Sequence, residues 1–565
     1  MIDKRIKLLK SKFIQNRIDG YVVPKNDEFF SEHAVKDRLK IISNFNGSAG
    51  LAIILKKRNY LFVDGRYTIQ AQQQSGKQFK IVEIHKFLPH NIIKNLTLGF
   101  DPSLFTKKQI NAYFGNLIIL KPINKNLIDE IYQEKIYKTK PFFSLEDKII
   151  GESYKSKINK ISNILKLNKV DYLFVSAPEN VAWMLNIRGS DNPNSPMPNC
   201  RLIIGKNKKL FLITQKQKAL KIIKDKKLGK NQIINPEKFK NLIKKLKGNK
   251  FIVDPLSCSI CNENIIKSKF KIIIKDDPCY KLKSIKNSSE IKHMINAHIE
   301  DGLALTKFIY WIKNINKKKI TEIDAQNKLE KFRKLNKNYL FPSFNTIAGT
   351  GSNGAIVHYR ALKKSNKTIK KNDLFLCDSG GQYKFGTTDV TRTICFSKQP
   401  KSIKDVFTKV LKGHIAVAKT NLKRFKSGKQ IDVRARQFLK KDGLDYAHGT
   451  GHGVGFFSNV HEGPQSISKY NTVKLQEGMV ISNEPGYYKK GHYGIRLENL
   501  MYIKKNKKKL QFENLTLAPI EKDLINHNLL NKGEKDYLFR YHLDVYAGHS
   551  KFLNKKEKKW LASLI

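Results

Sequence analysis

Four acidic residues and one histidine in the second half of the 565-residue chain have the types and settings of a metal site. Asp378 ends the apolar run DLFLCD and Asp389 lies in TTDVTRTICF, so a hairpin between them can place both carboxylates side by side near its open end. Two inward-pointing carboxylates repel strongly unless a cation lies between them. His452, Glu484 and Glu498 follow in HGTGHGVG, NEPGYY and GIRLEN. Four carboxylates and one imidazole are hard, oxygen-rich ligands, and this set predicts a pair of divalent ions of the manganese type.

Other motifs in the chain indicate different chemistry and are weaker. The segment Gly349–Gly354 matches GxGxxG, but the AIVHY that follows is typical of a strand rather than a phosphate-capping helix, which disfavours a dinucleotide site. Cys258 and Cys261 form a lone CxxC, and Cys279 alone cannot complete a zinc site, so incidental thiols are the simpler interpretation. No GxSxG elbow of a serine hydrolase is present.

The composition is strongly basic, with 108 Lys and Arg against 48 Asp and Glu, a formal net charge of +60. Such a charge attracts polyanions, yet the densest runs, Lys363–Lys371 and Lys504–Lys509, have no stacking aromatic residues between their lysines. We therefore expect solvated lysines and no nucleic-acid partner. No apolar run approaches the ~18–20 residues of a membrane span, and six scattered cysteines fit a reducing, cytoplasmic setting without a secretory signal.

The chain that precedes these candidate ligands divides into two segments of similar pattern. Near the N-terminus, apolar residues at helical spacing precede short β-rich runs between Tyr21 and Val63. A second set repeats this order, with helix-like KINKISNILKLNK before YLFVS, CRLIIG and KLFLIT. Between the sets, KTKPFFSLED carries a proline and is typical of a linker. We expect two α/β domains, at residues 1–145 and 146–286.

A third region, residues 287–504, combines long helices with antiparallel strands. Asn287 and Glu290 form a capping-box pattern that predicts the start of a helix. Strands and glycine turns follow from about residue 343, interrupted by helical patterns at 403–424 and 431–441. This order predicts an α+β domain that carries the candidate ligands.

The last segment, residues 505–565, follows the final candidate ligand. We therefore expect the site to be complete without it. Its aromatic and aliphatic residues, in YLFRYHLDVY and KKWLASLI, favour a packing or dimer-forming role.

Together the motifs resemble those of the pita-bread metallopeptidases, in particular the three-domain, cytosolic type of Xaa-Pro aminopeptidase. The similarity covers nearly the whole chain. DGYVVPKNDEFFSEH and VDGRYTIQA resemble the first domain of that family, SAPENVAWMLNIRGSDNP the second, and GSNGAIVHY, DSGGQY, HGTGHGVG, VHEGP, NEPGYY and GIRLEN the third. The resemblance implies two creatinase-like α/β domains followed by a pita-bread catalytic domain.

The resemblance also implies a role for each candidate ligand. Asp389 and Glu498 would bridge two divalent ions, Asp378 would bind one of them, and His452 and Glu484 would complete the other. Manganese is the first choice, with zinc or cobalt possible. Glu484 would in addition act as general base on the attacking water.

Further residues are expected near the substrate from the same resemblance. His358 and His461 would contact the substrate and stabilise the tetrahedral intermediate. His448 would line the proline side of the cleft, or else stabilise its glycine loop. Arg66 would reach the substrate from the first domain, with a structural salt bridge as the alternative. Arg496, two residues before Glu498, would be a further substrate contact.

The function that these features imply is the release of an N-terminal residue from peptides with proline in second position, by a hydroxide activated by two metal ions. A dipeptide-only prolidase, a creatinase-like hydrolase, a methionine aminopeptidase and a non-catalytic binding module are the alternatives. Methionine aminopeptidases lack the two leading domains, and the three-domain length disfavours prolidase. The resemblance further implies a homodimer joined through the catalytic domains.

Overall fold

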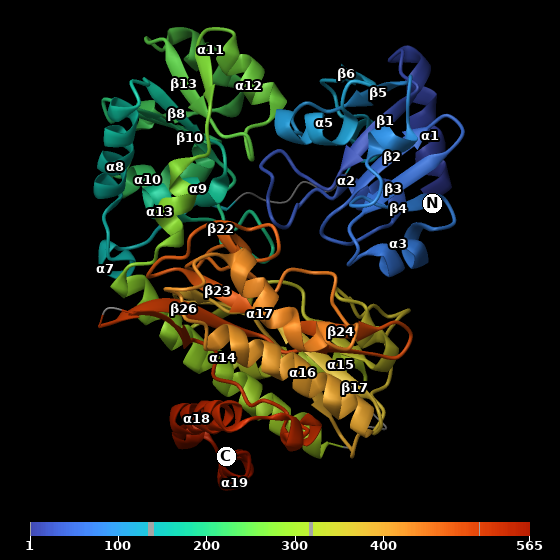
Figure 1. Ribbon diagram of the computed structural model, residues 1–565. Coiled ribbons are helices and arrows are strands. Elements are labelled where there is room, and N and C mark those ends of the chain that lie inside the picture. The colour runs from blue at the N-terminus through green and yellow to red at the C-terminus, as the bar shows by residue number, and fades with distance from the viewer. Residues whose placement is uncertain (1, 134–139, 316–319, 508) are drawn as a thin grey trace. The chain divides into compact units, whose positions relative to one another are not determined.

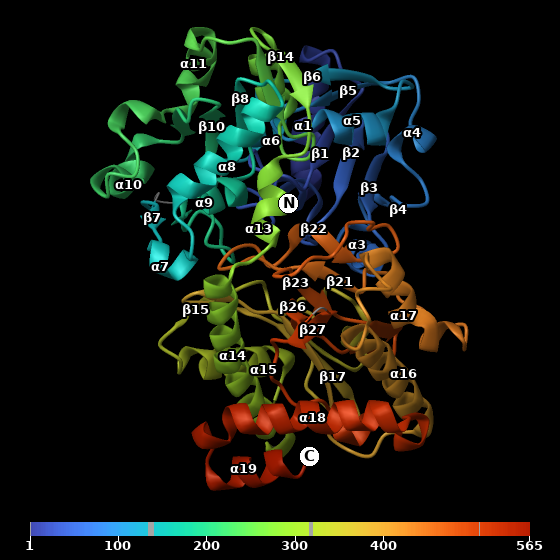
Figure 2. The ribbon, with the colours of Figure 1, turned by 60° about the vertical axis from the view of Figure 1, so that its left-hand side comes forward.

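The structure is a computed structural model that describes residues 2–133, 140–315, 320–507 and 509–565. It contains two compact units, Met1–Tyr280 and Lys281–Ile565, which are described separately. The first unit holds two six-stranded sheets (Figures 1 and 2). The second unit holds all five candidate ligands.

The first sheet of unit 1 has the strand order β4-β3-β2-β1-β5-β6. Strand β1, in the middle of the sheet, pairs antiparallel with β2 on one side and parallel with β5 on the other. Helix α1 (Ile2–Gln15) buries Ile6, Leu9 and Phe13 against one face of the sheet, whereas the next residue, Ile14, is 85% exposed. The strands are β1 (Gly20–Pro24), β2 (Leu51–Leu55), β3 (Asn59–Val63), β4 (Lys80–Glu83), β5 (Thr97–Phe100) and β6 (Ile119–Pro122).

The second sheet of unit 1 repeats the order and the strand directions of the first. The order is β12-β11-β10-β8-β13-β14, with the same antiparallel centre and parallel flanks. Helix α8 (Tyr154–Leu167) precedes β8 as α1 precedes β1. The strands are β8 (Tyr172–Val175), β10 (Arg201–Gly205), β11 (Leu210–Ile213), β12 (Ile233–Ile234), β13 (Lys250–Val253) and β14 (Lys271–Ile274). The expectation of two similar α/β segments is confirmed.

The linker predicted for KTKPFFSLED is wrong in its described part. Phe142 is fully buried, and β7 (Phe143–Ser144) pairs antiparallel with β9 (Ile187–Arg188). The proline is followed by apolar residues, and burying them draws the chain into the second α/β segment. Residues 138 and 139 of the stretch lie outside the described residues.

Unit 2 begins with the predicted capping box. Asn287 Oδ1 accepts the N–H of Glu290 at 3.0 Å, and the Asn287 N–H donates to Glu290 Oε2 at 3.1 Å. Helix α14 (Ser288–Asn314) follows, and with α15 (Glu322–Lys334) it covers the antiparallel sheet β16-β17-β20. These strands are β16 (Ile347–Thr350), β17 (Leu374–Ser379) and β20 (Val390–Cys395).

The second half of unit 2 repeats the pairing of helices with a sheet. Helices α16 (Lys401–Ala418) and α17 (Gly428–Lys440) lie side by side in Figure 1, and their buried faces pack on a sheet of order β22-β21-β23-β26-β27. The strands are β21 (Gly451–Gly453), β22 (Glu462–Ile467), β23 (Val480–Asn483), β26 (Asn499–Asn506) and β27 (Lys509–Asn514), and a separate hairpin joins β24 (Gly486–Lys489) to β25 (Tyr493–Arg496). In both halves of unit 2 the helices therefore cover a sheet, and the candidate ligands lie on or next to the strands of these sheets.

The strand expected at AIVHY is absent. After β16 the chain turns through the 3-10 helix η5 (Gly351–Ala355), with Gly351 at φ +52°. The turn continues, because the Tyr359 N–H donates to the Ile356 carbonyl at 3.0 Å and the buried Tyr359 hydroxyl donates to Glu322 Oε2 at 2.8 Å. Burying this tyrosine hydroxyl against a carboxylate outweighs the β-propensity of the neighbouring Ile and Val.

The C-terminal segment belongs to unit 2 and packs into its core. Helices α18 (Lys532–His549) and α19 (Lys555–Ala562) contribute Tyr541, Val545 and Leu561 to a core that also contains residues of α16. Figure 2 shows α18 lying across α14, which it contacts. Within the described ranges, no helix combines the length and apolar character needed to cross a bilayer.

Candidate metal centre

Two antiparallel strands bring the first two candidate ligands together. β17 pairs with β20 so that Asp378 lies opposite Thr391, and Asp389 immediately precedes β20. Both carboxylates therefore lie at the end of the ladder next to the connection, and the predicted location near the open end of the hairpin is wrong. The connection is not a plain loop, because it contains the short strands β18 (Gly381–Tyr383) and β19 (Gly386–Thr387).

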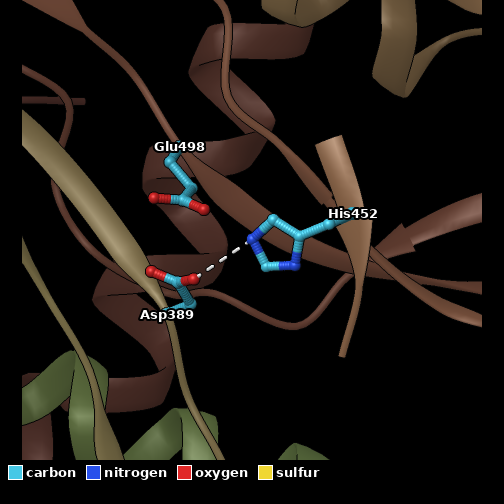
Figure 3. A group of neighbouring side chains, drawn as sticks. All are labelled: Asp389, His452 and Glu498. Atoms are coloured by element: carbon cyan, nitrogen blue, oxygen red, sulfur yellow. Dashed lines mark ion pairs between the residues drawn. The ribbon is translucent and has the colours of Figure 1, made fainter. Parts of the chain in front are cut away.

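Asp389, His452 and Glu498 converge, as Figure 3 shows. One ligand atom of each lies within 4.8 Å of the others. His452 Nε2 is 3.4 Å from Asp389 Oδ2 and 3.5 Å from Glu484 Oε1. His452 Nδ1 lies 2.9 Å from the Gly453 carbonyl, a contact that assigns the proton to Nδ1. The lone pair of Nε2 then points among the carboxylates, as it does in a metal-binding histidine.

The carboxylates of this cluster are withdrawn from water and close to one another. Asp378, Asp389 and Glu498 are 7%, 5% and 2% exposed. Burial, and then the negative charges of the neighbouring carboxylates, raises the pKa of Glu498 well above its ordinary range. Asp378 Oδ1 is buried with no hydrogen-bond partner in the described part of the chain. A divalent cation would satisfy this oxygen and offset the repulsion, so the residues present fit a metal site.

Hydroxyl groups and one guanidinium fix the orientation of the carboxylates. Thr391 Oγ1 donates to Glu498 Oε2 at 2.7 Å, and Ser482 Oγ donates to Glu484 Oε1 at 3.1 Å. Each of these hydroxyls binds one oxygen of its carboxylate. Such contacts from outside the ligand set orient ligands and tune their affinity for a metal.

Arg496 is buried at 2% exposure, and its side chain is held by protein atoms. Its Nη2 donates to Asp378 Oδ2 at 2.6 Å, its Nη1 donates to the Tyr488 hydroxyl at 2.6 Å, and its Nε donates to Thr391 Oγ1 at 3.1 Å. The structure therefore brings Arg496 to the candidate ligands. Its predicted contact with substrate stays a prediction.

Two of the predicted substrate-side histidines lie beside the cluster. The ring centroids of His461 and His452 are 4.2 Å apart, and His461 is exposed. His448 is half-buried, with Nδ1 2.7 Å from the Gly449 carbonyl and Nε2 2.9 Å from the Tyr488 hydroxyl. His448 thus contacts both its own glycine loop and a tyrosine that reaches Arg496, and its predicted place on the proline side of the cleft stays a prediction.

His358 and Arg66 are placed less directly. The carbonyl of Val357, the residue before His358, accepts from Arg496 Nη1 at 3.4 Å, which ties this turn to the cluster. Arg66 belongs to unit 1, where its Nη2 lies 2.7 Å from Asp64 Oδ2. The salt bridge weighed as the alternative for Arg66 is therefore present, and the predicted substrate contacts of both residues stay predictions.

Several residues of the site were not recognised in the sequence. Tyr488, Thr391 and Arg392 each hold a ligand or its neighbour. Arg392 could have been found, because it is the only charged residue in the strand VTRTIC, which is fully buried. A buried charge requires fixed polar partners, so an arginine in such a strand indicates a structured polar site. Tyr488 gave no comparable signal in NEPGYY.

A second acidic cluster is already neutralised. Cys395, Glu521 and Asp523 also have metal-ligand spacing. Lys313 Nζ donates to Glu521 Oε1 at 2.7 Å and to Asp523 Oδ2 at 3.0 Å, so an ammonium group holds the position that a cation would take. This arrangement is an ion pair that fastens α14 to the C-terminal segment.

Comparison with known proteins places the whole chain. The model of metallopeptidase family M24 matches residues 292–505, and the C-terminal region of peptidase M24 matches 508–564. Creatinase/prolidase N-terminal domain models match 5–126 and 133–290.

Curated relatives and solved structures agree with these matches. A probable Xaa-Pro aminopeptidase P of Coprinopsis cinerea is 35% identical over 99% of this chain and 97% of its own, and Xaa-Pro aminopeptidase 1 of Dictyostelium discoideum is 35% identical over 100% and 96%. The X-prolyl aminopeptidase of Caenorhabditis elegans, described as a cytosolic enzyme with a di-nuclear active site, superposes with a TM-score of 0.92 at 29% identity over 100% of this chain and 99% of its own. The carboxylate cluster, the two creatinase-type segments and the pita-bread catalytic domain are thus explained together: the chain belongs to metallopeptidase family M24, in its group of Xaa-Pro aminopeptidases.

Proposed function

We propose that the protein is a metal-dependent aminopeptidase that removes the N-terminal residue from peptides with proline in second position, with two divalent ions per chain and manganese the first choice. The observation that carries this proposal is the donor set itself. Asp389, Glu484 and Glu498 converge on His452, and Asp378 Oδ1, a buried oxygen on the strand paired with β20, has no protein partner in the described residues. Such hard donors suit manganese, while availability and geometry decide among manganese, zinc and cobalt.

Five residues would hold the ions: Asp378, Asp389, His452, Glu484 and Glu498. When bound, two divalent ions polarise the scissile carbonyl and make water acidic enough to attack near neutral pH. The donor atoms are fixed in advance by the contacts of Thr391, Ser482 and Arg496 described above. Little reorganisation is then needed when a peptide enters.

Glu484 is the carboxylate best placed to move a proton. It is half-buried, whereas Glu498 is 2% exposed, so Glu484 can exchange a proton with the attacking water and the departing amine. Its backbone N–H donates to the Thr450 carbonyl at 2.8 Å and its Oε1 accepts from Ser482, which leaves Oε2 for this transfer. Glu484 takes the proton of water and returns it to the proline nitrogen as the bond breaks.

His461 and His358 would act on the carbonyl oxygen. A ring N–H donated to that oxygen stabilises the negative charge that develops when water adds to the carbonyl. His461 is exposed beside His452, which fits a group that meets substrate. His448 and Tyr488 would form the wall next to the proline ring.

The preference for proline follows from its tertiary amide. An Xaa-Pro bond has no N–H, so a peptidase that must hydrogen-bond this N–H binds such a peptide poorly. The ring also fixes φ, and a site shaped for the ring can gain contacts with it. Purified protein with Mn²⁺ should release the first residue from an Xaa-Pro-Pro tripeptide and leave a matched Xaa-Ala-Pro tripeptide intact.

The same assay separates the alternatives. Cleavage of an Xaa-Pro dipeptide alone would identify a prolidase, and no cleavage of any peptide would indicate a binding module. Elemental analysis should find two ions per chain in the active enzyme. One ion or none in fully active enzyme would contradict the proposed mechanism.

Assembly and location are part of this proposal. Phe539, Leu543 and Phe552 of the C-terminal segment are 52%, 45% and 49% exposed, apolar content of the kind that a homodimer interface uses. A cytoplasmic location is supported by the absence of disulfides among the six cysteines, all of which lie in described residues, and by the cytosolic description of the C. elegans enzyme. We propose no nucleic-acid or membrane partner.

A further inference from the structure

Arg392 in β20 is a buried arginine that makes no ion pair with a carboxylate of the described residues. It is 1% exposed, and no carboxylate oxygen lies within ion-pair distance of it in the described part of the chain. All three of its nitrogens instead donate to neutral acceptors. These are the carbonyls of Pro519, Thr391, Glu498 and Ala518, Asn499 Oδ1 and the Tyr541 hydroxyl, at 2.6–2.9 Å. A buried charge with this many aligned acceptors is a fixed joint between the segments that supply them.

On one side of this joint is a candidate metal ligand. Arg392 Nη1 donates to the backbone carbonyl of Glu498 at 2.6 Å. The preceding residue, Thr391, accepts the Glu498 N–H at 3.1 Å and donates to its carboxylate at 2.7 Å. Glu498 is therefore held at its N–H, its carbonyl and its carboxylate by two consecutive residues of β20. The same strand starts one residue after Asp389, so its position sets the separation of Asp389 and Glu498.

On the other side of the joint is the C-terminal segment. The Tyr541 hydroxyl of α18 accepts from Arg392 Nη2 at 2.9 Å and lies 2.9 Å from the Ala518 carbonyl, to which it donates. It also accepts the Ala518 N–H at 3.2 Å. Tyr541 thus fixes both the guanidinium and the backbone that supplies two of its other acceptors. The site was expected to be complete without residues 505–565, yet this segment contacts the arginine that holds the Glu498 carbonyl.

We infer that Arg392 and Tyr541 are positioning residues that fix Glu498 relative to Asp389, and that the C-terminal segment thereby controls how tightly the metal pair is held. This inference rests on the proposed metal site. Neither residue touches the reacting atoms. Arginine is required because its planar fork reaches several acceptors at once, whereas a lysine ammonium is a compact group with three donors.

A test must separate position from charge. Removing Arg392 also removes a positive charge that acts on the Glu498 carboxylate, and this loss by itself favours cation binding. Tyr541→Phe keeps that charge and deletes only the hydroxyl. Tyr537→Phe is the matched control, because Tyr537 lies one turn earlier on α18, stacks on Tyr541 at 6.4 Å and accepts from Asn514 Nδ2 rather than from Arg392.

The experiment measures the Mn²⁺ dissociation constants of full-length wild-type, Tyr541→Phe, Tyr537→Phe and Arg392→Lys proteins by chelator competition, with thermal unfolding of each metal-free form. We expect Tyr541→Phe to bind Mn²⁺ ~10–100-fold more weakly than wild type, as is usual when a group that orients a ligand is lost. Its kcat should recover at excess Mn²⁺ with KM unchanged. Tyr537→Phe should keep wild-type affinity, and Arg392→Lys should show the larger loss if it folds.

The possible outcomes separate this inference from the proposed function. Wild-type protein that binds two Mn²⁺ and cleaves Xaa-Pro-Pro, with equal affinity in Tyr541→Phe, would overturn the inference and leave the function intact. Equal weakening in Tyr541→Phe and Tyr537→Phe would assign the effect to helix packing and also overturn it. Wild-type protein that binds none of Mn²⁺, Zn²⁺ and Co²⁺ would overturn both.

Discussion

The two oxygens of Asp378 have different surroundings: Oδ2 accepts a hydrogen bond from Arg496 Nη2 at 2.6 Å, whereas Oδ1 is buried and has no hydrogen-bond partner among the described residues. The guanidinium fixes the plane of the carboxylate and leaves one oxygen directed at the cluster. A carboxylate held in this way is organised for a cation before the cation arrives.

Asp378→Asn should test this organisation. An asparagine can turn its carbonyl oxygen toward Arg496, which leaves an uncharged NH₂ group where the cation needs a negative oxygen. We expect Mn²⁺ affinity to fall by at least ~10–100-fold, the usual cost of losing even a group outside the ligand set, with little change in fold by circular dichroism. Asp373→Asn is the control, because Asp373 precedes the same strand and contacts Thr350 Oγ1. Unchanged affinity in Asp378→Asn would remove Asp378 from the ligand set.

Metal removal should lower the stability of the protein, since the carboxylates then repel one another. A ligand that binds only the folded state raises the free energy of unfolding by about 2.7 kcal/mol at 100 times its dissociation constant. We expect Mn²⁺ to raise the melting temperature of wild type and to leave that of Asp389→Ala unchanged. Each variant is compared with and without Mn²⁺, so packing effects of the substitution cancel. A similar Mn²⁺-dependent rise in Asp389→Ala, or residual peptidase activity, would contradict the role of Asp389.

Sequence patterns predicted those features of the fold that depend on contacts between residues close together in the chain. The Asn287–Glu290 capping box and the strand that carries Asp378 depend on residues a few positions apart, and both are present, although the strand continues to Ser379. The Arg392–Tyr541 contact joins residues 149 positions apart, and no spacing rule reports such a pair. Asp389 was found by residue type, but its place beside the connection depends on the short strands β18 and β19, which carry no periodicity. Phe142 lies next to a proline, which is a linker signal, and only its long-range packing, which buries it fully, shows that the signal misleads.

Acid should destabilise the protein through buried neutral histidines. Burial, and then the charge of Arg392, lowers the pKa of His542 to about 4 and that of His414 to about 3. In the unfolded chain a histidine titrates near ~6.5. Between about pH 6.5 and the folded pKa, the unfolded state binds a proton that the folded state does not. The contribution of each such histidine to the free energy of unfolding is therefore fully present above pH ~6.5. Below that pH it falls by about 1.4 kcal/mol per pH unit until the folded pKa is reached.

Urea unfolding of metal-free protein at pH 7, 6 and 5 measures this slope. His542→Gln keeps a side-chain acceptor for the Ile520 N–H, now received by His542 Nε2 at 3.2 Å, but cannot take up a proton. We expect this variant to lose about 1.4 kcal/mol per pH unit of the dependence below pH ~6.5. His492→Gln, at an exposed position, should keep the wild-type slope. Equal slopes in wild type and His542→Gln would show that His542 is not buried in its neutral form.

The apolar face of α18 should join two copies of the chain. Phe539 and Leu543 are four residues apart on this helix, so they lie on one face, and they are 52% and 45% exposed although the helix packs its other face into the core. The net charge of +60 opposes self-association, and salt at ~0.15 M screens that repulsion over about 8 Å. We expect light scattering at this salt concentration to give twice the mass of one chain for the wild-type protein. The double variant Phe539→Glu/Leu543→Glu should give the mass of one chain, because four like charges would then meet in one apolar interface. Leu167→Glu alters a leucine of unit 1 that is 83% exposed and should leave the dimer intact, so a dimer that survives the double variant would place the interface elsewhere.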